Sequence, residues 1–248
     1  MKNKVTALDE ILTHIQDGQT ILFGDWHGEL SAEEVITGVL EKGVKDIEAI
    51  AVSGGMPDQG VGRLIVEHRV KTLRTTHIGL NPVAKDQLVA GELEVEFIPQ
   101  GTFAERIRAG GYGLGGVLTP TGVGTQVAEG KQVLNLNGKD YILEMPIHGD
   151  VALIKAWRAD TAGNVQFRLT GRATNSYSAY AADYVVCEVE EIVEVGELSP
   201  DEIDIPAPVI DALYVRKGEK KPFCPMWKRA KAKAEAKAAA KAAEGGNK

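Results

Sequence analysis

Residues 20–52, TILFGDWHGELSAEEVITGVLEKGVKDIEAIAV, contain a complete strand–helix–strand pattern. Thr20–Phe23 and Ile47–Val52 are short apolar runs of the length expected for buried strands. Between them, Ser31-Ala-Glu-Glu34 has the spacing of a helix capping box, apolar residues follow at helical intervals, and Gly43 marks the helix end. This order of elements predicts a parallel, right-handed βαβ unit.

The alternation of strands and helices continues on both sides of this unit. A helix is predicted to begin at Thr6–Asp9 and to end near Gly18, and Glu92–Phe97 alternates as a half-solvated strand does. The other predicted helices and buried strands are residues 61–68, 82–90, 151–157 and 183–189. The pattern indicates an α/β fold, an open and mostly parallel sheet flanked by helices. Asn137-Gly138, between two short runs, predicts a β-hairpin inserted at residues 131–144.

The composition is that of an ordinary globular protein. Of the 248 residues, 44% are hydrophobic and 25% are charged. No apolar run approaches the roughly 18 residues of a membrane span, and the N-terminus lacks an apolar signal core. Cys187 and Cys224 provide neither metal-ligand spacing nor a disulfide framework. We therefore expect a cytoplasmic protein with no metal and no membrane partner.

The net charge of −7 is unevenly distributed along the chain. Residues 228–248 contain seven Lys or Arg and two Glu, a charge of +5, so −12 remains on the other residues. An acidic body argues against a nucleic-acid partner. We expect one domain, residues 1–221, and a basic Ala/Lys-rich helical tail, residues 222–248. The tail is interpreted as a solvated helix or as an arm that docks on an acidic partner.

Residues 106–125, RIRAGGYGLGGVLTPTGVGT, contain seven glycines, which indicates a backbone shaped around a ligand or a close neighbour. Gly111–Gly116 matches the G-x-G-x-x-G motif literally. A dinucleotide-binding loop follows a strand and opens a helix. Here a predicted helix precedes the glycines, and Pro120 prevents a helix after them. The dinucleotide interpretation is therefore rejected.

Several motifs in order resemble the α subunit of family I coenzyme A (CoA) transferases over residues 1–215. They are Gly91–Glu96, Pro99–Thr102, Glu105–Gly111, Thr119–Thr125, Glu129–Lys131, Ala152–Trp157, Ala162–Asn164 and Val189–Leu198. Thr76-His-Ile-Gly79 and Asn81-Pro82 point to the acetate/butyrate–acetoacetate type, also called the 3-oxoacid CoA-transferase type. The resemblance implies the CoA-transferase/NagB-like form of the α/β fold.

The resemblance implies ping-pong transfer of CoA from a short-chain acyl-CoA to a free carboxylic acid. In two-subunit members, the β subunit carries a glutamate that attacks the thioester and then holds CoA as a glutamyl thioester. This chain is thus expected to supply half of the site and no catalytic residue, in an α2β2 heterotetramer. CoA is a substrate, and no cofactor is bound permanently. The alternative is a non-transferring member of the same fold superfamily, either a sugar-phosphate isomerase-like enzyme or an acyl-ligand-sensing module.

The resemblance also implies which residues face the substrates. Gln100 stands where the family's glutamine reaches the acyl group, and an amide can donate to a carboxylate; its alternative role is to cap the next helix. The glycine run is expected either to offer N–H groups to an anion or to allow close packing at a subunit interface. Its predicted substrate-binding residues are Gly110, Gly111, Gly113, Thr119 and Gly122. Arg106 and Arg108 are interpreted as structural ion-pair partners.

Residues 24–30, GDWHGEL, depart from the family's glycine-rich CoA-binding turn, because Asp25 replaces a glycine and polar His27 and Glu29 are added. The turn is assigned to CoA or substrate binding through Gly24, Asp25, Trp26, His27, Gly28, Glu29 and Leu30. Three interpretations remain open: recognition of a polar or cationic acid by Asp25, His27 or Glu29, a tolerant surface turn, or loss of normal CoA handling.

Two further segments depart from the family's pattern. Ser53-Gly-Gly-Met56 stands where family members often carry asparagines that contact the substrate carboxylate. Arg172-Ala-Thr-Asn175 replaces the usual Arg-Asn-Phe-Asn. Departures at three loops suggest an altered acid specificity rather than a lost fold.

Overall fold

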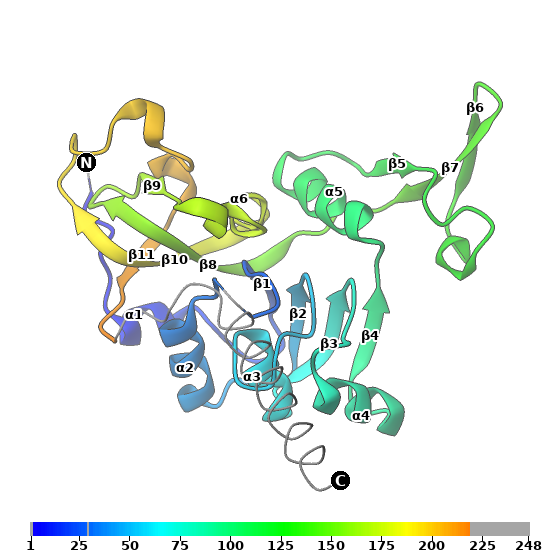
Figure 1. The fold of residues 1–248 in the computed structure, drawn as a ribbon, viewed down its shortest axis with the longest axis horizontal. Helices are drawn as coiled ribbons and strands as arrows, with labels where there is room; N and C mark the ends of the chain where they lie inside the picture. Colours follow the sequence, from blue (N-terminus) through cyan, green and yellow to red (C-terminus); the bar gives the residue numbers. More distant parts are fainter. Residues whose placement is uncertain (1, 29, 219–248) are drawn as a thin grey trace, which may run out of the picture. The chain divides into compact units, whose positions relative to one another are not determined.

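One mostly parallel sheet organises the chain in the computed structural model, which describes residues 2–28 and 30–218. Its strands are β1 (Thr20–Phe23), β2 (Ile47–Ala51), β3 (Val70–Thr75), β4 (Glu94–Phe97), β8 (Gly149–Asp160), β9 (Val165–Gln166), β10 (Ala182–Val193) and β11 (Ala212–Val215). Their spatial order is β11-β10-β8-β1-β2-β3-β4. All pairs along this path are parallel, and β9 pairs antiparallel with β8. The predicted sheet is confirmed (Figure 1).

Helices cover both faces of this sheet (Figure 1). They are α1 (Leu8–Thr13), α2 (Glu33–Lys42), α3 (Val61–Val66), α4 (Pro82–Ala90), α5 (Gln100–Gly111) and α6 (Asn175–Ser178), with 3₁₀ turns at Gln126–Ala128, Leu169–Arg172, Pro200–Glu202 and Ala207–Val209. Side chains alternate along a strand. Ile21 and Phe23 therefore face a core shared with α1, α2 and α3, whereas Leu22 faces a second core shared with α5. Strands that are apolar on both faces produce this three-layer arrangement.

The βαβ unit of β1, α2 and β2 forms as predicted, but its helix cap is different. Oγ of Ser31 donates to the carbonyl of Gly28 at 3.0 Å instead of accepting from α2. The first turn of α2 is capped from β10, where Oε2 of the buried Glu188 accepts from the N–H groups of Glu34 (2.8 Å) and Val35 (3.1 Å). The predicted Ser31 capping box is thus wrong, because a strand far along the chain supplies the acceptor.

A second, antiparallel sheet is inserted between β4 and β8. Its strands are β5 (Val117–Thr119), β6 (Val133–Leu136) and β7 (Lys139–Glu144), in the order β5-β7-β6. Asn137 and Gly138 both have positive φ, 53° and 78°, as the tight hairpin turn requires. The predicted hairpin is confirmed, and the end of the glycine run adds β5 as an unpredicted third strand.

The sequence pattern also missed two strands of the main sheet. β3 carries charged Lys71 and Arg74 between apolar positions, and β11 is only four residues long. The compact unit that contains the sheet comprises residues 1–216. The predicted boundary at 221/222 and the helical tail 222–248 lie outside the described residues. Within residues 2–28 and 30–218, no helix is long and apolar enough to cross a membrane.

Candidate functional site

The loops after β1, β2, β3 and β4 gather at one edge of the main sheet, since the four strands are parallel neighbours. These loops are residues 24–30, 52–60, 76–81 and 98–99. In open α/β sheets, ligands bind beyond the carboxyl ends of the strands. The described residues of the predicted 24–30 turn and Gln100 both lie at this edge, while Glu29 lies outside the described residues.

Asp25 is completely buried two residues after the end of β1. Its N–H donates to Oγ1 of Thr174, and its carbonyl accepts from the same hydroxyl, both at 2.7 Å. Oγ of Ser31 donates to Oδ2 of Asp25 at 3.4 Å. The departing segments 24–30 and 172–175 therefore contact each other. For Asp25, the interpretation as a surface-turn residue is wrong.

The carboxyl group of Asp25 is poorly compensated. Burial raises the pKa of Asp25 to about 8, although hydrogen bonds from Ser31 and Gly28 lower it. Within the described part of the chain, its Oδ1 has no hydrogen-bond partner. A buried charge without a partner is costly, so the protonated form is favoured at neutral pH. An enclosed, neutral carboxyl group cannot recognise a cationic substrate, which excludes that role for Asp25.

The two family glycines of this turn are required by close packing. A Cβ on Gly24 would clash with Oδ1 of Asn175, which accepts from the N–H of Lys155 at 2.9 Å. Gly28 has φ of 87°, and a Cβ there would lie 2.9 Å from the carbonyl oxygen of Gln59. The turn is thus held by the loop after β2 and by the start of α6. Its role in CoA binding stays a prediction.

Trp26, His27 and His77 form an aromatic group at the same edge. The ring centroids of Trp26 and His27 are 4.8 Å apart, and those of His27 and His77 are 4.9 Å apart. Trp26 is 44% exposed. Desolvation, and then the neighbouring His77, lower the pKa of His27. We did not predict His77 as a site residue, because only the strand order brings it beside His27.

Gln100 is the exposed first residue of α5, immediately beyond β4. Pro99 occupies the N-cap position, and no side-chain cap bond is formed there. The alternative role of Gln100 as a cap is therefore not supported. Its predicted contact with the acyl group stays a prediction, which its position at the sheet edge permits.

The two arginines of α5 are structural, as predicted. Buried Arg106 donates from Nη1 to Glu96 at 2.6 Å and from Nε to the carbonyl of Met145 at 2.7 Å. Arg108 pairs with Glu105 at 2.8 Å on the exposed face of the helix. Both guanidinium groups are engaged within the chain.

The first glycines of the 106–125 run serve packing within the chain. A Cβ on Gly110 would clash with the carbonyl of Ile147, and a Cβ on Gly111 would lie 2.9 Å from the Tyr180 backbone. Gly113 follows with φ of 68° and open space around it. Close approach accounts for Gly110 and Gly111 without a ligand, but the contact is internal and is not a subunit interface.

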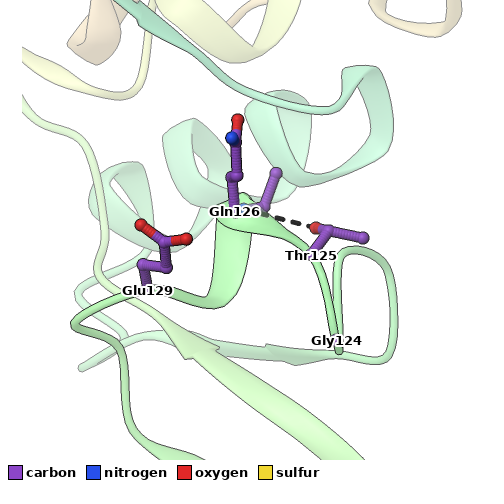
Figure 2. A pocket seen from close by; sticks show the side chains of 5 residues that line it. Gly124, Thr125, Gln126 and Glu129 are labelled. Carbon is purple, nitrogen blue, oxygen red and sulfur yellow. Dashed lines mark hydrogen bonds between the residues drawn. The ribbon is translucent and has the colours of Figure 1, made fainter.

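The rest of the run belongs to the antiparallel sheet. Oγ1 of Thr119 accepts from the N–H of Thr121 at 3.2 Å, and Gly122 has φ of 93° against the side chain of Val127. A shallow hollow beside this turn is lined by Gly124, Thr125, Gln126, Val127 and Glu129 (Figure 2). Oγ1 of Thr125 accepts from the N–H of Val127 at 3.3 Å within it. None of the predicted site residues lines this hollow.

The fold and this loop cluster define an α/β protein whose candidate ligand site lies at the carboxyl edge of a parallel sheet. Residues 5–216 match the family described as Coenzyme A transferase. The alpha subunit of the acetate CoA-transferase of Escherichia coli (strain K12) is 45% identical over 220 residues, which are 89% of this chain and 100% of that one. The chain therefore belongs to the coenzyme A transferase family.

Further comparisons agree with this membership. One subunit of the succinyl-CoA:3-ketoacid coenzyme A transferase of Helicobacter pylori (strain J99) is 44% identical, over 89% of this chain and 94% of that one. The solved acyl-CoA transferase of E. coli O157:H7, in a thioester complex with CoA, has the same fold, with a TM-score of 0.78 and 21% identity. The match covers 90% of this chain but only 49% of that one, so this chain spans about half of its length.

Proposed function

We propose that this chain is the α subunit of an enzyme that moves CoA from a short-chain acyl-CoA to a free carboxylic acid. The observation that carries the proposal is one of length. The chain matches the whole alpha subunit of one relative but only half of a solved acyl-CoA transferase chain. The remaining half of the site is therefore expected on a β subunit, in an α2β2 complex in the cytoplasm.

The proposed chemistry is covalent catalysis through a glutamate of the β subunit. Its carboxylate attacks the thioester carbon, which forms a mixed anhydride and releases the CoA thiolate. The thiolate then attacks the glutamyl carbonyl of the anhydride, which releases the first acid and leaves a glutamyl-CoA thioester. The incoming carboxylate reverses both steps, so that a new acyl-CoA leaves and the glutamate is regenerated.

This chain contributes binding rather than the nucleophile in the proposed enzyme. Gln100 is exposed where the sheet edge meets α5, and its amide is a neutral donor for an acyl oxygen. Asp25, the carboxyl group nearest in sequence to the end of β1, is enclosed and cannot serve as the nucleophile. The matches to transferase subunits favour this function over the isomerase-like or sensor alternative.

Reconstitution with a β subunit tests the proposal. The chain alone is expected to transfer no CoA, and the complex is expected to do so with ping-pong kinetics. Incubation with acyl-CoA, and not with the free acid, should make the complex sensitive to borohydride, which reduces a glutamyl thioester. Transfer by the isolated chain, or a complex that acyl-CoA does not sensitise, would overturn the proposed mechanism.

A further inference from the structure

Two of the five histidines of the chain lie at the carboxyl edge of the main sheet. His27 follows β1 and His77 follows β3. The other three precede strands and therefore lie toward the opposite edge: His14 before β1, His68 before β3 and His148 before β8. The pair is thus singled out by topology, because residues 27 and 77 meet only through the parallel order of the strands.

The loop after β2 leaves room for this pair. β2 lies between β1 and β3, and its loop carries glycine at positions 54 and 55. The N–H of Gly54 donates to the carbonyl of His77 at 2.9 Å, and a Cβ on Gly54 would lie 3.2 Å from Ile78. The His27 and His77 rings then approach to 4.9 Å between centroids, with 58° between their planes.

His27 has unused hydrogen-bonding capacity. Its Nδ1 is buried and has no hydrogen-bond partner among residues 2–28 and 30–218. Its backbone adopts φ of 57°, an uncommon conformation for a residue other than glycine, and the turn is fixed by Gly28 against Gln59. A strained residue with an unsatisfied buried polar atom, at the carboxyl edge of a parallel sheet, is typical of a binding site.

The chemistry of the pair favours an anion. Each neutral imidazole offers one N–H donor, and a nearby anion would favour the protonated form, which has two. A cation would be repelled by any protonated imidazole of the pair. Trp26 lies 4.8 Å from His27 between ring centroids and is 44% exposed, so it offers an apolar surface beside these donors.

We propose that His27 and His77 together bind the carboxylate of the acid substrate, with Trp26 against its short carbon chain. This inference rests on the proposed function and replaces the expected recognition of a cationic acid. The shared chemistry is that of an anionic oxygen, which CoA phosphates also present, so the test separates the two sources.

Histidine signals provide the direct test. In the reconstituted complex with ¹³C-histidine in this chain, titration with acetate is expected to shift the His27 and His77 imidazole signals. His14, His68 and His148 are internal controls that should not move. The result would overturn the inference if CoA without acid were the ligand that moved the pair, or if no signal of the pair moved. This measurement does not require CoA transfer.

Kinetics provide the second test. His27→Asn, which tolerates positive φ, and His77→Gln are each expected to raise the KM for the acid about tenfold, with little change in kcat. His148→Gln is the matched control and should leave both constants unchanged. Unaltered KM for the acid in folded variants of an active complex would overturn this inference but not the proposed function. An inactive wild-type complex would instead count against the proposed function.

Discussion

At the scale of single residues, Asp25 shows how a substitution in a glycine-rich turn is accommodated. Its backbone is held on both sides by one hydroxyl, that of Thr174, and its side chain is enclosed with Ser31. The position keeps the turn closed instead of presenting charge to CoA. Because the carboxyl group is buried and its pKa is about 8, its ionisation is linked to folding.

Asp25→Asn should therefore change stability in a pH-dependent way. The pKa of Asp25 is raised from 3.8 to about 8 by folding. The folded protein thus holds a proton that the unfolded chain releases, and stability is lost as pH rises from about 4 to about 8. The amide is expected to be about 1–3 kcal/mol more stable than wild type at pH 8, with a smaller gap at pH 5. Urea unfolding at the two pH values measures this, and a gap independent of pH would contradict the shifted pKa.

At the scale of elements, α5 and α2 are both fixed by contacts from distant segments. α5 ends in Gly110 and Gly111, which allow the helix to reach the backbone near Ile147 and Tyr180. α2 receives its cap from Glu188 of β10, which replaces the local capping box. In each case the helix itself was predictable, whereas its docking was not.

Gly110→Ala tests the helix contact. The new Cβ would clash with the carbonyl of Ile147, and rigid backbone on both sides cannot yield cheaply. We expect destabilisation of about 2–3 kcal/mol in thermal or urea unfolding. Gly115→Ala is the control, because a Cβ at that position meets nothing within 4 Å and should be nearly neutral. Equal stability of the two variants would show that α5 is not packed as described.

Glu188→Ala tests the cap of α2. It removes the acceptor of two backbone N–H groups, each of which is then left without its bond. The expected loss is about 2–3 kcal/mol. Glu188→Gln keeps an acceptor oxygen at this position and should lose clearly less. If alanine and glutamine destabilised the protein equally, the negative charge and not the hydrogen bonds would be the stabilising factor.

At the scale of the whole molecule, the part that matches the family ends where the first compact unit ends. The family match stops at residue 216, and the unit comprises residues 1–216. The basic segment 228–248 is therefore outside the part that the fold and the candidate site require.

A chain truncated after Gly218 should retain the function of the full chain. Its melting temperature and its CoA transfer in the reconstituted complex are expected to be unchanged, since the sheet, both cores and the site loops precede the cut. Size-exclusion chromatography with the β subunit provides the control for assembly. Loss of complex formation would assign the basic tail a docking role.

The sequence by itself determined the layers and the family. Apolar runs of strand length alternating with helical repeats were sufficient for the parallel sheet, because both periods are local properties of the chain. Asn137-Gly138 likewise fixed a hairpin through the backbone of two residues. Short or charged strands such as β11 and β3 were missed, since sheet neighbours and not local pattern stabilise them.

Only the tertiary structure decided which side chains meet. It buried Asp25 against Thr174 across 149 positions of sequence, and it brought His77 to His27 across an intervening strand. It also showed that Gly110 and Gly111 serve internal packing. The physical reason is that burial, pKa and contact depend on groups supplied by other strands, and the order of parallel strands in space is not written in any local period of the sequence.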